Sequence, residues 1–148
     1  MAAVAAAVVA LDQLTKAAIV ETMLPGERTD LALGFDLTRV TNSGIAFGLF
    51  SGGDDTLVIL FTAAALGLIV GWFALDTARP LLWLGVGLLC GGAIGNLADR
   101  IREGAVTDFF DPPLWPAFNL ADVAITAGVV VIAVAALWPP EPEPEPSP

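Results

Sequence analysis

The chain has 148 residues, of which 56% are hydrophobic and 15% charged, so it is too apolar for an ordinary soluble domain and indicates a polytopic membrane protein. It has no histidine and a single cysteine, which excludes a Ser-His-Asp triad, a histidine-ligated metal and a CxxC redox pair. Any acid-base chemistry must therefore come from carboxylates, and Cys90 is expected to be a small packing residue. A net charge of −10 with only six lysines and arginines gives nucleic-acid binding almost no electrostatic support.

Four apolar segments are long enough to cross a bilayer, which takes about 17 to 25 helical residues. They are residues 1–20, 57–75, 81–97 and 118–138. The first carries Asp12 and Lys16 and lacks both a basic leading region and a convincing cleavage site, so we expect a retained helix rather than a signal peptide. The sequence predicts a single membrane domain over 1–138, an all-α bundle of four transmembrane helices, followed by a disordered acidic, proline-rich tail over 139–148.

The order of the helices predicts which loops share a side of the membrane. Because successive spans alternate direction, we expect loops 21–56 and 99–117 on one side, and the turn 76–80 with both termini on the other. Apolar residues that alternate at period two in the first loop predict a strand, within a small sheet or β-cradle over about residues 28–50 at the membrane surface. The alternating residues are Leu31, Leu33, Phe35 and Leu37. Most loop arginines fall on this side, which by the positive-inside rule would be cytoplasmic, but so few charges give that count little weight.

Ionisable residues at membrane depth are functional candidates, because burying a charge there costs about 2.5 to 3.5 kcal/mol on insertion scales. Asp12 and Lys16 stand at i and i+4, a spacing that allows a simple ion pair along one helix face. Asp99 and Arg100 are most simply an interfacial cap and a snorkelling arginine. Asn96 lies on the same face about a turn deeper, where an amide needs a partner.

A second polar group marks the start of the last span. Asn119 and Asp122 stand at i and i+3, and capping of the helix would explain one of them but not both together with Asp108. Two carboxylates brought together at a membrane surface can share one proton, so that one acts as a base and the other as an acid. The pattern leaves three interpretations open: an aspartic protease, a small four-helix proton-coupled transporter, and a structural four-helix protein. The acids gather at one interface rather than at the bilayer midplane, which favours the protease.

Four blocks of the sequence resemble the signature blocks of bacterial lipoprotein signal peptidase, or signal peptidase II, in that family's order. They are LDQLTK at 11–16, TNSGIAFGLF at 41–50, GGAIGNLADRIREGAVTDFFD at 91–111 and FNLADVAI at 118–125. The resemblance implies an intramembrane aspartic endopeptidase of the bacterial inner membrane, with cytoplasmic termini and an extracytoplasmic β-cradle and active site. It would act as a monomer without metal or cofactor, in contact with membrane lipids. Its substrates would be prolipoproteins, cut before a cysteine that carries a diacylglyceryl group.

Carried over position by position, the resemblance places the catalytic dyad on Asp108 and Asp122, and contacts to the substrate backbone on Asn96 and Arg100. Further signature positions that support the site are Asn42, Asp12, Asp99 and Asn119. The surface loop that contains Asn42 and Phe47 would then clamp the bound peptide. The link between the two dyad positions, filled by DPPLWPA, is shorter than we expect for the family, which leaves open the shape of the substrate entrance and the closeness of the two aspartates.

Overall fold

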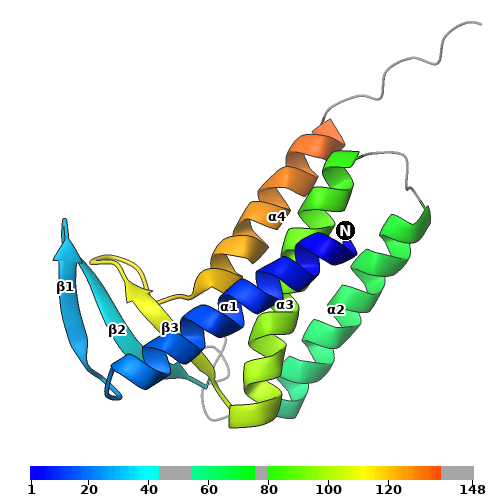
Figure 1. Ribbon diagram of the computed structural model, residues 1–148. Coiled ribbons are helices and arrows are strands. Elements are labelled where there is room, and N and C mark those ends of the chain that lie inside the picture. Colours follow the sequence, from blue (N-terminus) through cyan, green and yellow to red (C-terminus); the bar gives the residue numbers. More distant parts are fainter. Residues whose placement is uncertain (44–54, 76–79, 138–148) are drawn as a thin grey trace, which may run out of the picture.

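The computed structural model describes residues 1–43, 55–75 and 80–137. Within them, the elements in chain order are α1 (Ala2–Thr22), β1 (Arg28–Ala32), β2 (Phe35–Asn42), α2 (Asp55–Leu75), α3 (Pro80–Glu103), β3 (Val106–Asp111) and α4 (Leu120–Leu137). The helices form a bundle and the strands form a small sheet beside one end of it (Figure 1). The predicted cradle residues 44–50 with Phe47, most of the predicted turn and the predicted tail lie outside the described residues.

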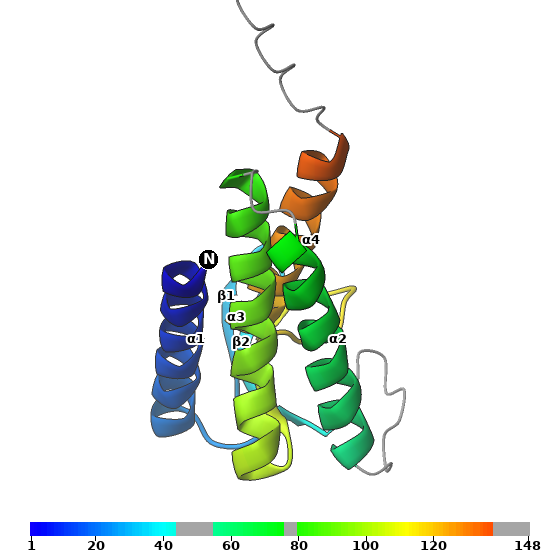
Figure 2. The same ribbon diagram turned by 90° about the vertical axis from the view of Figure 1, so that its right-hand side faces the viewer.

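The four predicted spans all correspond to helices, and three of those helices are apolar and long enough to cross a membrane within the described part of the chain. These three are Ala2–Thr22, Leu81–Glu103 and Leu120–Leu137. The remaining helix, α2, contains a shorter described apolar stretch, Thr62–Gly71. The helix α3 lies in the middle of the bundle and contacts each of the other three (Figures 1 and 2). The protein is therefore mostly helical, as predicted.

Glycines on α3 allow two other helices to approach it closely. A Cβ atom at Gly91 would lie 2.7 Å from the Cβ of Val8 on α1, and one at Gly92 would lie 2.3 Å from the carbonyl oxygen of Ala121 on α4. Both distances are too short for any side chain, so α3 touches α1 and α4 almost backbone to backbone, as the small residues of this block predict. Cys90 is buried nearby in an apolar cluster, in agreement with a packing role.

The three strands form one antiparallel sheet in the order β1-β2-β3. The strands β1 and β2 come from the first predicted surface loop and β3 comes from the second, so the two loops lie on the same side as predicted. The prediction of one continuous strand through Leu33 is wrong. Leu33 and Gly34 both have positive φ, 59° and 81°, and form a two-residue turn that pairs Ala32 with Phe35. Ala32 and Phe35 pair across this turn and therefore share a face of the sheet, which the period-two alternation of a continuous strand does not predict.

A glycine directs the chain from α3 into the sheet. Gly104 follows the last residue of α3 with φ 71°, and its N–H donates to the Arg100 carbonyl oxygen at 3.0 Å. A left-handed residue after the helix ends it, because only glycine adopts this conformation at little cost. The strand β3 begins two residues later, so this turn places the strand that carries Asp108 beside the end of α3.

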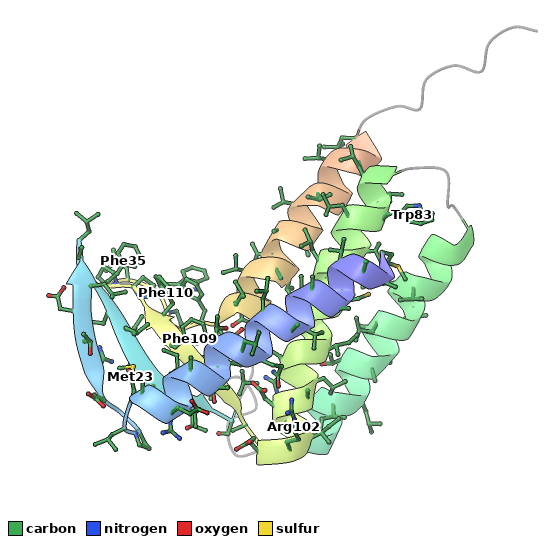
Figure 3. All side chains as sticks on the ribbon, viewed as in Figure 1. Met23, Phe35, Trp83, Arg102, Phe109 and Phe110 are labelled. Atoms are coloured by element: carbon green, nitrogen blue, oxygen red, sulfur yellow. The ribbon has the colours of Figure 1, made fainter. Side chains whose placement is uncertain are left out.

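The sheet is fastened to the end of α1 by a small buried cluster and an arginine. Ile19, Met23 and Phe109 are buried together, and Figure 3 shows Met23 and Phe109 at the junction of sheet and helix. The Arg39 side chain on β2 donates to the carbonyl oxygens of Val20 at 3.1 Å and Met23 at 2.9 Å. These carbonyls at the end of α1 have no partner within the helix, so the guanidinium caps it.

Candidate active site

The first turn of α4 is closed by two of the predicted site residues. The Asp122 N–H donates to Asn119 Oδ1 at 3.0 Å, and the Asn119 N–H donates to Asp122 Oδ2 at 3.2 Å. This is a reciprocal capping box, with the acid in the helix turn that favours negative charge. The expectation that capping explains only one of the two residues is therefore wrong, because both take part in the same cap.

Asp108 lies in the middle of β3 and is only 2% exposed. Its Oδ1 accepts a hydrogen bond from Asn119 Nδ2 at 2.7 Å, and its Oδ2 accepts one from Asn42 Nδ2 at 2.9 Å. Because Asn119 also caps α4 together with Asp122, a single side chain contacts both predicted dyad residues.

The pairing of Phe110 with Phe118 explains how the short link brings β3 and α4 together. Two backbone hydrogen bonds of 2.9 Å join these residues, and their rings stack with centroids 5.7 Å apart. The link from Asp111 to Ala117 is closed at its two ends by this bridge, so Asn119, the residue after Phe118, lies directly beside β3. The link is therefore long enough to keep Asp108 and Asp122 in one network.

Asn96 on α3 completes this network. Its Nδ2 donates to Asp122 Oδ1 at 2.8 Å, and its Oδ1 accepts from Asn119 Nδ2 at 3.1 Å and from Lys16 Nζ at 2.8 Å. Each of the four carboxylate oxygens of Asp108 and Asp122 thus accepts one N–H group. Donors that are already in place favour the buildup of negative charge at a site without any rearrangement.

The environment of Asp108 raises its pKa from 3.8 to about 6. Burial is the largest cause, because removal from water disfavours the charged form, and the Asp122 carboxylate adds to it. The N–H groups of Asn42 and Asn119 and the ammonium of Lys16 act in the opposite direction. A carboxyl group that titrates near pH 6 can serve as a proton donor in a site that works near neutrality.

A buried ion-pair cluster lies next to the network. The Lys16 ammonium is 2.9 Å from Asp12 Oδ2 and 2.7 Å from Asp99 Oδ2. The predicted pair of Asp12 with Lys16 is confirmed, whereas the interpretation of Asp99 as an interfacial cap is wrong, because Asp99 is buried and also accepts from Gln13 Nε2 at 2.9 Å. Asp12 Oδ1 accepts the Ala121 N–H at 2.9 Å, so Asp12 also fixes the start of α4.

Seven of the eight predicted site residues thus belong to a single set of contacts at the junction of three helices and the sheet. They are Asp12, Asn42, Asn96, Asp99, Asp108, Asn119 and Asp122. The eighth, Arg100, is half-buried on α3. Sequence reasoning considered Lys16 only as a partner of Asp12 and did not link it to Asn96 or Asp99. The signal was available, because an ammonium at membrane depth near several acids is expected to bind more than one of them.

A family model described as signal peptidase (SPase) II matches residues 4–138. The chain belongs to the signal peptidase II family. The lipoprotein signal peptidase of Pelotomaculum thermopropionicum is 44% identical over 133 residues, which cover 89% of this chain and 88% of that protein. The lipoprotein signal peptidase of Moorella thermoacetica is 41% identical over 133 residues, 89% of each chain.

Two solved structures, each described as a bacterial membrane enzyme, have the same fold. One gives a TM-score of 0.82 at 34% identity and covers 90% of this chain and 85% of the other. The second gives a TM-score of 0.80 at 34% identity and covers 90% of both chains. The resemblance identified from the four sequence blocks is therefore confirmed, and as a member of the signal peptidase II family the chain is a peptidase.

Proposed function

We propose that this peptidase removes signal peptides from diacylglyceryl-modified prolipoproteins, cutting before the lipidated cysteine with an aspartate dyad and an activated water. The observation that carries the proposal is the hydrogen-bond network in which Asp108 and Asp122, from a strand and a helix, each accept two N–H groups. The names of the relatives support the substrate class. The lack of histidine supports carboxylate chemistry.

The two aspartates have different roles in the proposed reaction. Asp108 is the protonated member, because burial already raises its pKa to about 6 and a bound substrate removes more water from it. It hydrogen-bonds to the carbonyl oxygen of the scissile bond and withdraws electron density from the carbon. Asp122 lies in the first turn of α4, where negative charge is favoured, and is the ionised general base.

The proposed reaction needs no covalent intermediate. Asp122 takes a proton from water as the water oxygen attacks the carbonyl carbon, and the carbonyl oxygen receives the proton of Asp108. When the tetrahedral intermediate collapses, the C–N bond breaks and the leaving nitrogen receives the proton held by Asp122. Asp108 recovers a proton from the intermediate's hydroxyl group, so the pair returns to its starting state.

The other site residues fall into two groups in this proposal. Asn96 and Arg100 on α3 contact the backbone of the substrate. The remaining four hold the dyad in position, and they are Asn42, Asn119, Asp12 and Asp99. The donor geometry supports the positioning role for Asn42 and Asn119, because together they bond to both oxygens of Asp108 and keep its carboxylate from rotating. Asn96 also donates to Asp122, so it has a positioning role as well.

We also propose that all four helices cross the bacterial inner membrane, that the site faces the extracytoplasmic side and that the protein acts as a monomer. The sheet would then rest on the bilayer surface. Exposed apolar side chains at one end of the sheet support this, since Leu33 is 93%, Leu114 96% and Trp115 61% exposed. The two segments that carry them adjoin, because a Cβ at Gly34 would lie 3.6 Å from Pro113.

The test is cleavage of a purified diacylglyceryl-modified prolipoprotein by the purified enzyme, with the unlipidated precursor alongside. We expect cleavage of the lipidated form only. Asp108→Asn and Asp122→Asn should each reduce cleavage to background while the protein stays folded in the membrane. Asp36→Asn is the matched control, since Asp36 is a carboxylate of the same sheet that pairs with exposed Arg28 at 3.6 Å, and it should keep full activity.

Full activity in either dyad variant would refute the proposed mechanism. A folded but inactive Asp99→Asn protein, together with an active Asp108→Asn protein, would move the acid to Asp99. Cleavage of the unlipidated precursor at the same rate would refute the proposed substrate class.

A further inference from the structure

The direction of one amide group decides how many donors Asp122 receives. The side chain of Asn96 ends in an oxygen that only accepts hydrogen bonds and a nitrogen that only donates them, and rotation by half a turn exchanges the two. With its nitrogen toward Asp122, Asn96 makes a hydrogen bond of 2.8 Å. With the oxygen there instead, two acceptors would face each other and the carboxylate would lose a donor.

Two donors contact the opposite end of this amide. Lys16 Nζ lies 2.8 Å from Asn96 Oδ1, and Asn119 Nδ2 lies 3.1 Å from it. An ammonium has no acceptor, so it can bind only the oxygen of the amide. Lys16 is the closer of the two donors and carries a charge, and charge-assisted hydrogen bonds are about twice as strong as neutral ones.

The ammonium is itself held in place. Lys16 is only 4% exposed, and Asp12 and Asp99 lie on either side of it at 2.9 and 2.7 Å. The contacts therefore run from α1 through Lys16 to Asn96 on α3 and on to Asp122 on α4. Each step joins side chains on different helices, so the orientation of the amide depends on how the three helices pack.

We infer that Lys16 is a positioning residue of the dyad, whose ammonium holds the Asn96 amide with its N–H groups toward Asp122. Lys16 acts on the reaction through Asn96 and does not touch the substrate. The inference deepens the proposed function and rests on it, since it concerns the same pair of aspartates. It differs from a purely structural role, in which Lys16 would only neutralise Asp12 and Asp99 where they meet between the helices.

A double-mutant cycle separates the two roles. The variants are Lys16→Met, Asn96→Ala and the double substitution, with kcat and KM measured on the diacylglyceryl-modified prolipoprotein and the melting temperature measured for each. We expect Lys16→Met to lower kcat by about 10- to 100-fold with little change in KM, the range expected when a catalytic group is misplaced. The double variant should have the same kcat as Asn96→Ala alone, because Lys16 then has no amide to orient.

Two outcomes would overturn the inference. One is a kcat for Lys16→Met within about twofold of the wild-type value, even with a lowered melting temperature. The other is a double variant whose loss equals the product of the two single losses, because the effects of independent sites multiply in this way. Failure of the wild-type enzyme to cleave the lipidated substrate would instead refute the proposed function.

Two further variants keep the test interpretable. Lys16→Met leaves two buried carboxylates without their cation, which is strongly destabilising. If that variant does not fold, the cycle is repeated in an Asp99→Asn background, with Asp99→Asn alone as its reference. Arg102→Met is the matched control. Arg102, labelled in Figure 3, is another cation that joins α3 to α1, but it bonds to Gln13 and to the Ala98 carbonyl and not to Asn96. This variant should keep kcat within about twofold of the wild-type value.

Discussion

Substitution of Gly92 by alanine should separate α3 from α4 at the level of the active site. The added Cβ would lie 2.3 Å from the carbonyl oxygen of Ala121 and 2.8 Å from Ile125 Cγ1. The oxygen belongs to the α4 backbone and cannot rotate away as a side chain could. Since ordinary contact begins at 3.4 Å, α4 must retreat by about 1 Å at this point.

That displacement would act directly on the proposed dyad, because Asp122 follows Ala121 in the chain. A shift of about 1 Å away from α3 would stretch the 2.8 Å hydrogen bond from Asn96 to Asp122 beyond hydrogen-bond range. Overpacking of this kind costs about 1 to 3 kcal/mol of stability. A catalytic group misplaced by about 1 Å loses about 100-fold in rate, so we expect Gly92→Ala to lose far more activity than stability.

The assay is kcat on the lipidated substrate, alongside thermal unfolding followed by tryptophan fluorescence in detergent. Gly67→Ala on α2 is the matched control, because its Cβ would meet no atom within 4 Å in the described part of the chain. It should keep full activity and can gain up to about 1 kcal/mol from helix propensity. A Gly92→Ala enzyme with wild-type kcat and melting temperature would refute the reasoning from close helix packing.

Three further predictions concern individual contacts. Because the folded protein raises the pKa of Asp108 from 3.8 to about 6, it binds that proton more tightly than the unfolded chain. The stability gained from this group is complete below about pH 4 and is lost as the pH rises through about 6. The melting temperature of the wild type should therefore fall across that window. A comparable fall in Asp108→Asn would show that Asp108 is not the group responsible. Arg39→Met should destabilise the protein by about 1 to 2 kcal/mol in thermal unfolding, since it leaves the Met23 carbonyl at the end of α1 uncapped; an unchanged melting temperature would rule out the cap. Asp99→Asn should lower the melting temperature but leave kcat nearly unchanged, because it weakens the ion pair with Lys16 and removes no hydrogen-bond donor from the proposed dyad. An unchanged melting temperature together with a large loss of kcat would contradict this role.

Local patterns were sufficient to predict most of the contacts in the candidate site. Asn119 and Asp122 stand at i and i+3 at the start of an apolar run, a spacing that already indicates a helix start. The alternation of spans placed the loop of Asp108 on the same side as that start, and the sheet confirms it through the pairing of β2 with β3. Asn96 was recognised as an amide in need of a partner, and the structure supplies three.

Other features could not be predicted because the sequence pattern does not distinguish them from the alternative. The apolar residues from Leu31 to Leu37 alternate in the sequence as they would in a continuous strand, so only the backbone conformation shows the turn at Leu33 and Gly34. Asp99 has the sequence of an interfacial cap, but its burial against Lys16 depends on how closely α1 packs on α3. Glycines such as Gly91 allow α1 and α3 to approach closely, but their positions in the sequence do not show which residues of the two helices come into contact.

The sequence by itself determined that the protein is a mostly helical membrane peptidase, because composition, span length and four motif blocks are properties of the chain alone. The tertiary structure alone decided which side-chain amide serves three of the four carboxylate oxygens of Asp108 and Asp122. Asn42, Asn96 and Asn119 come from a strand, a helix and a helix cap, and their amides meet only after the helices and the sheet have packed. Hydrogen bonds require distances correct to a few tenths of an ångström, which residue spacing in the chain does not specify.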